Sequence, residues 1–205
     1  AGTYVFQLFS GVPIEVWNPR TLFPWTTFWI IAACMGVFAL ELLASAPSGD
    51  NSLIDSLALS PQLFEGENVW GVLTYMFLHG STAHLFGNML YLYIFGDNVE
   101  DKLGRKTFLR LYLTCGVAGG LAQALFVGPE GLAVVGASGA IAGVIAAYWV
   151  LFPFVRLRMV IFAIPIYLGI GTYTVGWLAI NLWMSTLSTG QTHTSWFFHL
   201  GGFAA

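Results

Sequence analysis

The chain has 205 residues, of which 57% are hydrophobic and only 8% are charged, and its mean hydropathy is +0.76. A soluble domain carries about 25% charged residues, so this composition excludes a surface that faces water over most of the chain. The net charge of −3 is weak and the sequence contains no basic stripe, so nothing indicates a nucleic-acid partner. We therefore expect a lipid bilayer around most of this protein.

Residues 1–21 form a mixed segment that we expect in the cytoplasm or at the membrane interface, and residues 22–205 are predicted to form one membrane domain. The first predicted span covers residues 22–44, which is long enough for the ~20 residues that a bilayer core requires. Glu41 falls in the last turn of this span, where a carboxylate can reach lipid headgroups.

A long connection follows the first span and contains two short amphipathic pieces, around residues 53–59 and 69–78. A loop of this length is unusual unless it is functional or has structure of its own. The second predicted span covers residues 83–98 and is short, as expected for a helix that ends below the membrane surface. The third covers residues 107–127.

The fourth predicted span covers residues 138–152 and the fifth residues 160–187, where Pro165 and several glycines allow a bend. The sixth begins near residue 196 and reaches residue 205, which is only about 15 Å of helix. A bilayer core of about 30 Å needs more, so we expect the chain to end inside its last helix. The predicted fold is thus all-α: a polytopic bundle of six membrane helices with the last one truncated.

The basic residues predict the orientation of this bundle. Six of the seven lie before the first span, between the second and third, or between the fourth and fifth, and Arg110 lies in the first turn of the third span on the same side. The positive-inside rule then places the N-terminus in the cytoplasm, and the starts of the fourth and sixth spans at the outer face. The size of the chain fits a bacterial or archaeal plasma membrane, and an organelle membrane stays open as an alternative. The basic residues are Arg20, Lys102, Arg105, Lys106, Arg110, Arg156 and Arg158.

Four polar residues are predicted to meet near the outer face. His84 and Asn88 are four residues apart and hence share one face of the second span. Ser138 opens the fourth span, and His199 lies near the start of the sixth. Polar residues inside a membrane are costly and are functional candidates by default.

These residue types together indicate nucleophilic catalysis. A serine needs a base to become a nucleophile, and histidine is the usual one, so Ser138 and His199 form the candidate pair. His84, Asn88 and the backbone amide of Ser138 can donate hydrogen bonds to a developing oxyanion. No acidic residue falls in the middle of a predicted span, which favours a Ser-His dyad over a triad. Ala140 excludes the Gly-x-Ser-x-Gly elbow of the α/β-hydrolases.

Several short motifs, in this order along the chain, resemble the rhomboid family of intramembrane serine proteases over about residues 62–205. Each motif alone is weak, but all of them on the expected helices are specific. They are LTYMFLHG at 73–80, HLFGNM at 84–89, FGDNVE at 95–100, GASG at 136–139 and HLGGF at 199–203.

The resemblance implies a six-helix fold in which Ser138 is the nucleophile and His199 the general base. It also implies that His84, Asn88 and the Ser138 amide hold the oxyanion, that no cofactor is needed, and that the substrates are transmembrane helices of other proteins. Ala142 stands where some members carry a tyrosine that stacks on the catalytic histidine. We therefore expect His199 to be held less firmly, or by another ring.

Other interpretations remain open at this point. Gly139 and Gly143 form a helix-packing motif whether or not Ser138 reacts. The chain could also be a catalytically inactive rhomboid-like protein that binds or escorts client helices, or a small channel or transporter. Histidines could bind a metal, but no carboxylate or thiolate is spaced to complete a site, so no metal is predicted. The two cysteines, Cys34 and Cys115, are expected to be buried thiols.

Overall fold

The computed structural model describes residues 13–16, 18–45, 52–66, 68–127, 132–161, 164–187 and 196–205, and most of these are helical. The main helices are α2 (Trp25–Ala44), α5 (Thr82–Leu103), α6 (Arg105–Val127), α7 (Ser138–Leu151), α8 (Ile170–Leu187) and α9 (Trp196–Ala204). The connection between α2 and α5 holds α3 (Ser52–Leu57), α4 (Gly71–Thr74) and two 3-10 turns, Leu63–Glu65 and Tyr75–Phe77.

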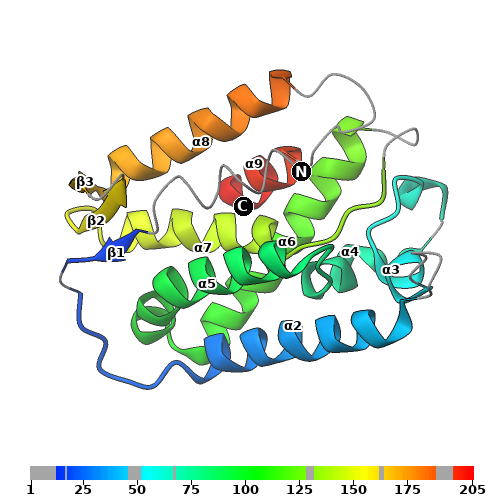
Figure 1. Ribbon diagram of the computed structural model, residues 1–205, viewed down its shortest axis with the longest axis horizontal. Helices are drawn as coiled ribbons and strands as arrows, with labels where there is room; N and C mark the ends of the chain where they lie inside the picture. Colours follow the sequence, from blue (N-terminus) through cyan, green and yellow to red (C-terminus); the bar gives the residue numbers. More distant parts are fainter. Residues whose placement is uncertain are drawn as a thin grey trace.

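Helix α7 lies at the centre of the bundle. It packs against α5, α6, α8 and α9, and α2 covers the outer side of α5 (Figure 1). Residues 139–145 of α7 are all buried, and apolar residues occupy every side of this helix. A helix that is apolar all round belongs in the core, so α7 is the frame that positions its own first residue, Ser138.

The boundary between α5 and α6 differs from the prediction. Helix α5 continues past residue 98 to Leu103, and Gly104, with a φ of +78°, turns the chain into α6. The extension is stabilised because the Glu100 carboxylate accepts hydrogen bonds from the backbone amides of Thr26 (2.8 Å) and Thr27 (2.7 Å). These amides lie at the N-terminus of α2, where they lack helical partners. The charged segment between the second and third predicted spans therefore includes a helix end that caps a neighbouring helix.

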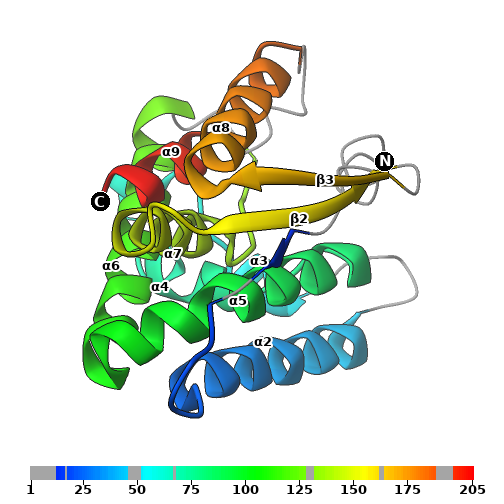
Figure 2. The same cartoon turned by 90° about the vertical axis from the view of Figure 1, so that its left-hand side faces the viewer.

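The fold is mostly helical, as predicted, but it also contains a small antiparallel sheet that the all-α prediction missed. The strand order is β1 (Ile14–Glu15), β2 (Arg156–Ile161), β3 (Ile164–Gly169). The end of β2 and all of β3 occupy the first part of the segment predicted as one helix, residues 160–187, and α8 begins only at Ile170. Pro165 has no backbone N–H and is disfavoured inside a helix, whereas the edge strand β3 tolerates it. The sheet projects from one end of the bundle (Figure 2).

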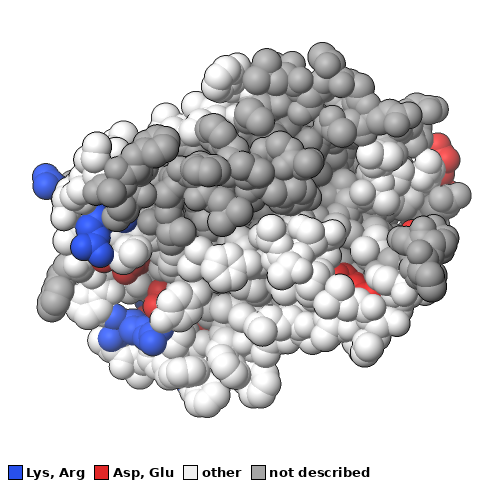
Figure 3. Space-filling view, in the orientation of Figure 1, with Lys and Arg blue, Asp and Glu red and all other residues white. Residues whose placement is uncertain are grey.

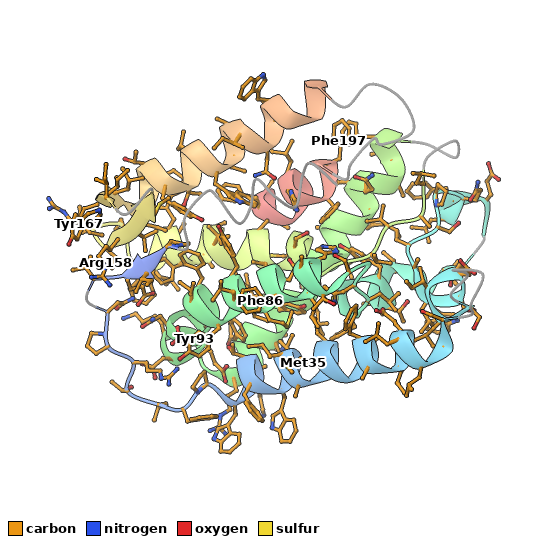
Figure 4. All side chains as sticks on the ribbon, viewed as in Figure 1. Met35, Phe86, Tyr93, Arg158, Tyr167 and Phe197 are labelled. Atoms are coloured by element: carbon orange, nitrogen blue, oxygen red, sulfur yellow. The ribbon has the colours of Figure 1, made fainter. Side chains whose placement is uncertain are left out.

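The surface of the molecule suits lipid over its middle. In Figure 3 the Lys and Arg side chains gather at the end that carries the sheet, where acidic groups lie beside them. The white residues between this end and the acidic groups at the other end form a band without charged side chains. Met35, Phe86 and Tyr93, labelled in Figure 4, are each more than half exposed within this band. Arg158 and Tyr167, which are register partners in β2 and β3, lie at the basic end.

Two helices in the described ranges, Trp25–Ala44 and Arg105–Phe126, are long and apolar enough to cross a membrane. The apolar helix Ser138–Leu151 is shorter. Helices at the other predicted spans are present, but the count of six membrane crossings stays a prediction. The buried state expected of Cys34 and Cys115 is confirmed.

Glu15 joins the sheet to the bundle. The Asn98 side-chain amide on α5 donates to both carboxylate oxygens of Glu15, at 3.1 and 2.9 Å. Burial raises the pKa of Glu15 from its ordinary 4.5 to about 7, and Asp97 adds to this, against hydrogen bonds from Tyr148 and Asn98 that lower it. Asp97 is itself paired with Arg20 at 2.9 Å. Between about pH 4.5 and 7 the folded chain therefore holds a proton on Glu15 that the unfolded chain releases.

Glu15→Gln is expected to flatten the pH dependence of stability. Because the folded pKa lies above the unfolded one, the contribution of Glu15 is full below pH 4.5 and is lost as the pH rises through 7. The partly exposed carboxylate is screened by solvent, so we expect a change of about 1 kcal/mol. Melting temperatures in detergent between about pH 4 and 8 would show it. Glu65→Gln, at an exposed site, is the control, and parallel curves for wild type and Glu15→Gln would contradict the prediction.

Candidate active site

The structure brings Ser138 and His199 together. Ser138 is the first residue of α7 and His199 lies on α9, and the His199 Nε2 atom is 2.8 Å from the Ser138 Oγ atom. His199 is 9% exposed. The 2.8 Å between Ser138 Oγ and His199 Nε2 is the separation of a hydrogen bond between a hydroxyl and a ring nitrogen. The pair predicted from the two motifs is thus placed with the geometry of a nucleophile and its base.

Glycines allow the two helices to approach this closely. A Cβ atom on Gly202 would overlap the backbone carbonyl oxygen of Gly139. A Cβ on Gly143 would overlap the Cys115 thiol and lie 2.7 Å from the Gly202 carbonyl oxygen. The backbones of α7 and α9 are therefore in direct contact beside the Ser138–His199 pair. Packing and catalysis are not competing explanations for these glycines, because the packing positions the pair.

The His199 ring is also held from α8. Its Nδ1 atom is 2.8 Å from the Asn181 Oδ1 atom, and the Trp177 ring lies 5.4 Å from it, centroid to centroid. The Phe198 ring centroid lies 4.4 Å from the His199 ring centroid. Ala142 supplies no ring from α7, so the expectation that another ring would hold His199 agrees with the position of Trp177.

Asn181 was not singled out from the sequence, although a signal was available. It is an amide inside an apolar run, 7% exposed, and such a residue is a functional candidate by the same argument that selected Asn88. The predicted fifth span was ten residues too long at its start, which obscured how deep in the membrane Asn181 would lie. Its contact with His199 follows only from the packing of α8 on α9.

Two of the predicted oxyanion donors lie beside Gly136, two residues before Ser138 in the chain. The His84 ring, on α5, packs against Gly136, where an added Cβ would lie 2.7 Å from Nε2 and 3.6 Å from the Asn88 Nδ2 atom. Gly136 also has a φ of +129°, which L side chains rarely adopt. Asn88 Nδ2 is buried and has no hydrogen-bond partner within the described ranges. A buried donor of this kind suits an anion that exists only during a reaction.

The backbone of Ser138 contributes a further donor. Ser138 occupies the first turn of α7, where amides have no intrahelical acceptor. The segment before it is fixed by the connection between α2 and α5. The Gly136 amide donates to the Tyr75 carbonyl at 2.9 Å, and Leu59 and Val134 form a two-way backbone bridge. The position of the Ser138 amide is thus set by tertiary contacts.

Glu41 is buried inside the protein and not exposed at the lipid headgroups as predicted. It is 2% exposed, and its carboxylate accepts the backbone amide of His79 at 3.1 and 3.3 Å rather than reaching headgroups. The His79 ring lies 5.3 Å from the His84 ring. Glu41 therefore holds the backbone of His79, whose ring packs against the ring of His84. His193, the remaining histidine, lies outside the described residues.

Comparisons with known proteins agree with the motifs. The family model described as Rhomboid domain matches residues 66–205. Rhomboid protein 1, mitochondrial, of Saccharomyces cerevisiae is 34% identical over 115 residues, covering 52% of this chain and 31% of that protein. RHOMBOID-like protein 1 of Arabidopsis thaliana is 26% identical over 230 aligned positions, covering 94% and 53%.

A bacterial relative carries the word protease in its name. Rhomboid protease GluP of Bacillus subtilis is 34% identical over 124 residues, which is 60% of this chain and 24% of that protein. The chain thus spans about half or less of the length of these three relatives.

Proposed function

The chain belongs to the rhomboid family, and on that premise we propose that it is an intramembrane serine endopeptidase. Ser138 and His199 would cleave transmembrane segments of other membrane proteins near the outer face of the bilayer. The observation that carries this proposal is the 2.8 Å contact between Ser138 Oγ and His199 Nε2. The buried Asn88 Nδ2 atom, which has no hydrogen-bond partner among the described residues, supports it. The family includes proteases, among them relatives of this chain.

The first half of the reaction forms an acyl-enzyme. His199 Nε2 takes the hydroxyl proton as Ser138 Oγ attacks the carbonyl carbon of the scissile peptide bond. Asn88 Nδ2, the His84 ring and the Ser138 amide stabilise the resulting oxyanion. The protonated His199 then gives its proton to the departing amine as the C–N bond breaks. An ester between Ser138 and the substrate remains.

The second half consumes one water molecule. His199 removes a proton from this water as its oxygen attacks the ester carbonyl carbon, and the same donors stabilise the second oxyanion. Collapse of this intermediate breaks the ester bond, returns the proton to Ser138 Oγ and releases the new carboxyl end of the substrate. The chemistry requires no cofactor, because the dyad and the donors supply each proton and each stabilising contact.

We place the dyad in the outer half of the membrane. Helix α7 runs about 20 Å from Ser138 towards β2, which carries Arg156 and Arg158 at the basic end. With these arginines in the cytoplasm, Ser138 lies short of the outer surface of a core about 30 Å thick. This topology uses six membrane helices in a prokaryotic plasma membrane with a cytoplasmic N-terminus, namely α2, α5, α6, α7, α8 and α9.

Covalent labelling tests the proposal. Detergent-solubilised protein, native or denatured in SDS, would be treated with a fluorophosphonate and the labelled serine located by mass spectrometry. Label on Ser138 in the native protein alone is expected, because the probe needs an activated serine. Ser56, exposed on α3, is an internal control that should stay unlabelled. A folded protein without label on Ser138 would instead favour the inactive rhomboid-like protein that binds client helices.

Asn88→Ala is expected to be slow but active. Loss of one oxyanion donor costs about 10²–10³ in kcat in soluble serine proteases, and KM should change little because the donor acts on the transition state. Cleavage rates of a fluorogenic transmembrane peptide in micelles would measure both constants. Tyr93→Phe, on the same helix at a 55% exposed position, is the control. A wild-type kcat in Asn88→Ala would remove Asn88 from the oxyanion site.

A further inference from the structure

We infer that Asn181 is a positioning residue that fixes His199 in the tautomer able to accept the Ser138 proton, so that the Ser138-His199 dyad is oriented by a third side chain. The inference rests on the proposed function and extends it by one residue. It is carried by two contacts of Asn181, one to the His199 ring and one to the backbone of α8.

The first contact, together with the contact to Ser138, gives each ring nitrogen of His199 a polar partner. Asn181 Oδ1 lies 2.8 Å from His199 Nδ1, and Ser138 Oγ lies 2.8 Å from His199 Nε2. The imidazole is thus held at both nitrogens, with Asn181 on the side away from the nucleophile. This is the place that the third residue occupies in catalytic triads.

The second contact fixes which way the Asn181 amide points. Asn181 Nδ2 donates to the backbone carbonyl of Trp177, one turn earlier in α8, at 2.6 Å. A carbonyl oxygen can only accept, so the NH₂ group must face Trp177 and the Oδ1 atom must face His199. The orientation of the amide follows from its partner and is not an arbitrary choice between oxygen and nitrogen.

The tautomer of His199 follows in turn. Because Oδ1 has no hydrogen to donate, the contact with His199 Nδ1 is a hydrogen bond only if Nδ1 carries a proton. A neutral imidazole carries one ring proton, so Nε2 is then left with a free lone pair. That lone pair faces the Ser138 hydroxyl, which is the arrangement required of a general base.

The contact between Asn181 Oδ1 and His199 Nδ1 is buried, so its loss should affect the tautomer of His199. Asn181 is 7% exposed and His199 9% exposed, so little water is present to replace the acceptor. The Trp177 and Phe198 rings flank the imidazole, and neither ring offers an acceptor to Nδ1. An amide also avoids the cost of burying a carboxylate at this depth in a membrane.

The decisive experiment compares Asn181→Leu with Asn181→Asp. Leucine keeps the approximate volume and removes the acceptor, whereas aspartate keeps the acceptor and adds a charge. Ile180→Leu, at a neighbouring position that is 40% exposed, is the matched control. For each protein, kcat and KM for a transmembrane peptide and the rate of fluorophosphonate labelling would be measured between about pH 5 and 9.

Asn181→Leu is expected to lower kcat and the labelling rate by about 10- to 100-fold with little change in KM. Asn181→Asp is expected to recover most of this loss above neutral pH. The carboxylate stabilises the imidazolium form, so the acid limb of the pH–rate profile of Asn181→Asp should move to higher pH. Ile180→Leu should match the wild type in both constants and in profile.

A second readout does not depend on activity. Nitrogen NMR of histidine-labelled protein distinguishes the two tautomers of His199, with His199→Gln identifying its signal. Wild type is expected to carry the proton on Nδ1, and Asn181→Leu to lose this preference.

Two results would overturn the inference while leaving the proposed protease intact. One is that Asn181→Leu has the same His199 tautomer and the same kcat as the wild type, when the wild type reacts with the fluorophosphonate at Ser138. The other is an equal loss in Asn181→Leu and Asn181→Asp with an unshifted pH profile, which is the behaviour of a residue that only holds α8 to α9. A wild type that takes no label at Ser138 refutes the proposed function instead, and the NMR experiment then still reports whether Asn181 sets the tautomer.

Discussion

Ser138→Ala is expected to abolish cleavage of a transmembrane substrate. Removal of the Ser138 Oγ atom removes the nucleophile, and no acyl-enzyme can form. Serine proteases that lose this atom lose about 10⁶ in kcat, because the base and the oxyanion donors cannot act without the nucleophile. In proteoliposomes this loss would place the rate at background. The fold should persist, since the hydroxyl is a small group at a helix start.

The control for this prediction is Ser56→Ala, which removes a hydroxyl from the exposed surface of α3. It should cleave at the wild-type rate. The melting temperature of Ser138→Ala should lie close to that of wild type, which would separate loss of chemistry from loss of structure. Cleavage by Ser138→Ala at even a few per cent of the wild-type rate would contradict the whole mechanism.

Gly202→Ala is expected to be the most damaging single-methyl change in the described part of the chain. Its Cβ atom would overlap the Gly139 carbonyl oxygen, and the Cys115 carbonyl oxygen lies at 3.1 Å on the same side. Neither neighbour is the end of a flexible side chain, so α9 must move away from α7. We expect a loss of about 1–3 kcal/mol in stability from overpacking.

The same movement should separate the dyad. Gly202 follows His199 by three residues on α9, and Gly139 follows Ser138 directly on α7, so the strain falls beside the reacting atoms. A displacement of about 1 Å can cost about 10²-fold in rate. Melting temperature and kcat of Gly202→Ala should therefore fall together.

Gly176→Ala is the matched control, because nothing lies within 4 Å of the Cβ it would add on α8. Alanine is the better helix former, so this variant should be neutral or more stable by up to about 1 kcal/mol. Gly202→Ala with the melting temperature and kcat of Gly176→Ala would show that α7 and α9 are not packed as described.

Much of the architecture could be predicted because it depends on local patterns. Apolar runs bounded by charged or glycine-rich segments located α2, α6 and α7 to within a few residues. Ser138, His199, His84 and Asn88 could be selected because they are polar residues inside apolar spans and their residue types suit one chemistry, and the family motifs agreed. The roles of these four residues remain predictions, which the labelling and variant experiments test.

Local patterns failed where a partner distant in sequence decided the outcome. The segment around Pro165 is apolar enough for a membrane helix, yet it forms β3 because β2 offers hydrogen bonds that a proline-containing edge strand can use. Glu41 is buried because the His79 amide, in a separate connection, satisfies its carboxylate. Neither partner can be identified from the composition of the segment itself.

The sequence by itself determined that this is a helical membrane protein of the rhomboid family with one candidate serine and one candidate base, because hydropathy, basic residues and motif order are properties of the chain alone. Only the tertiary structure decided that Ser138 and His199 lie 2.8 Å apart and that Asn181 holds the far side of the ring. The physical reason is that these contacts depend on glycine-mediated approach of α7 and α9 and on the packing of α8, which no single segment encodes.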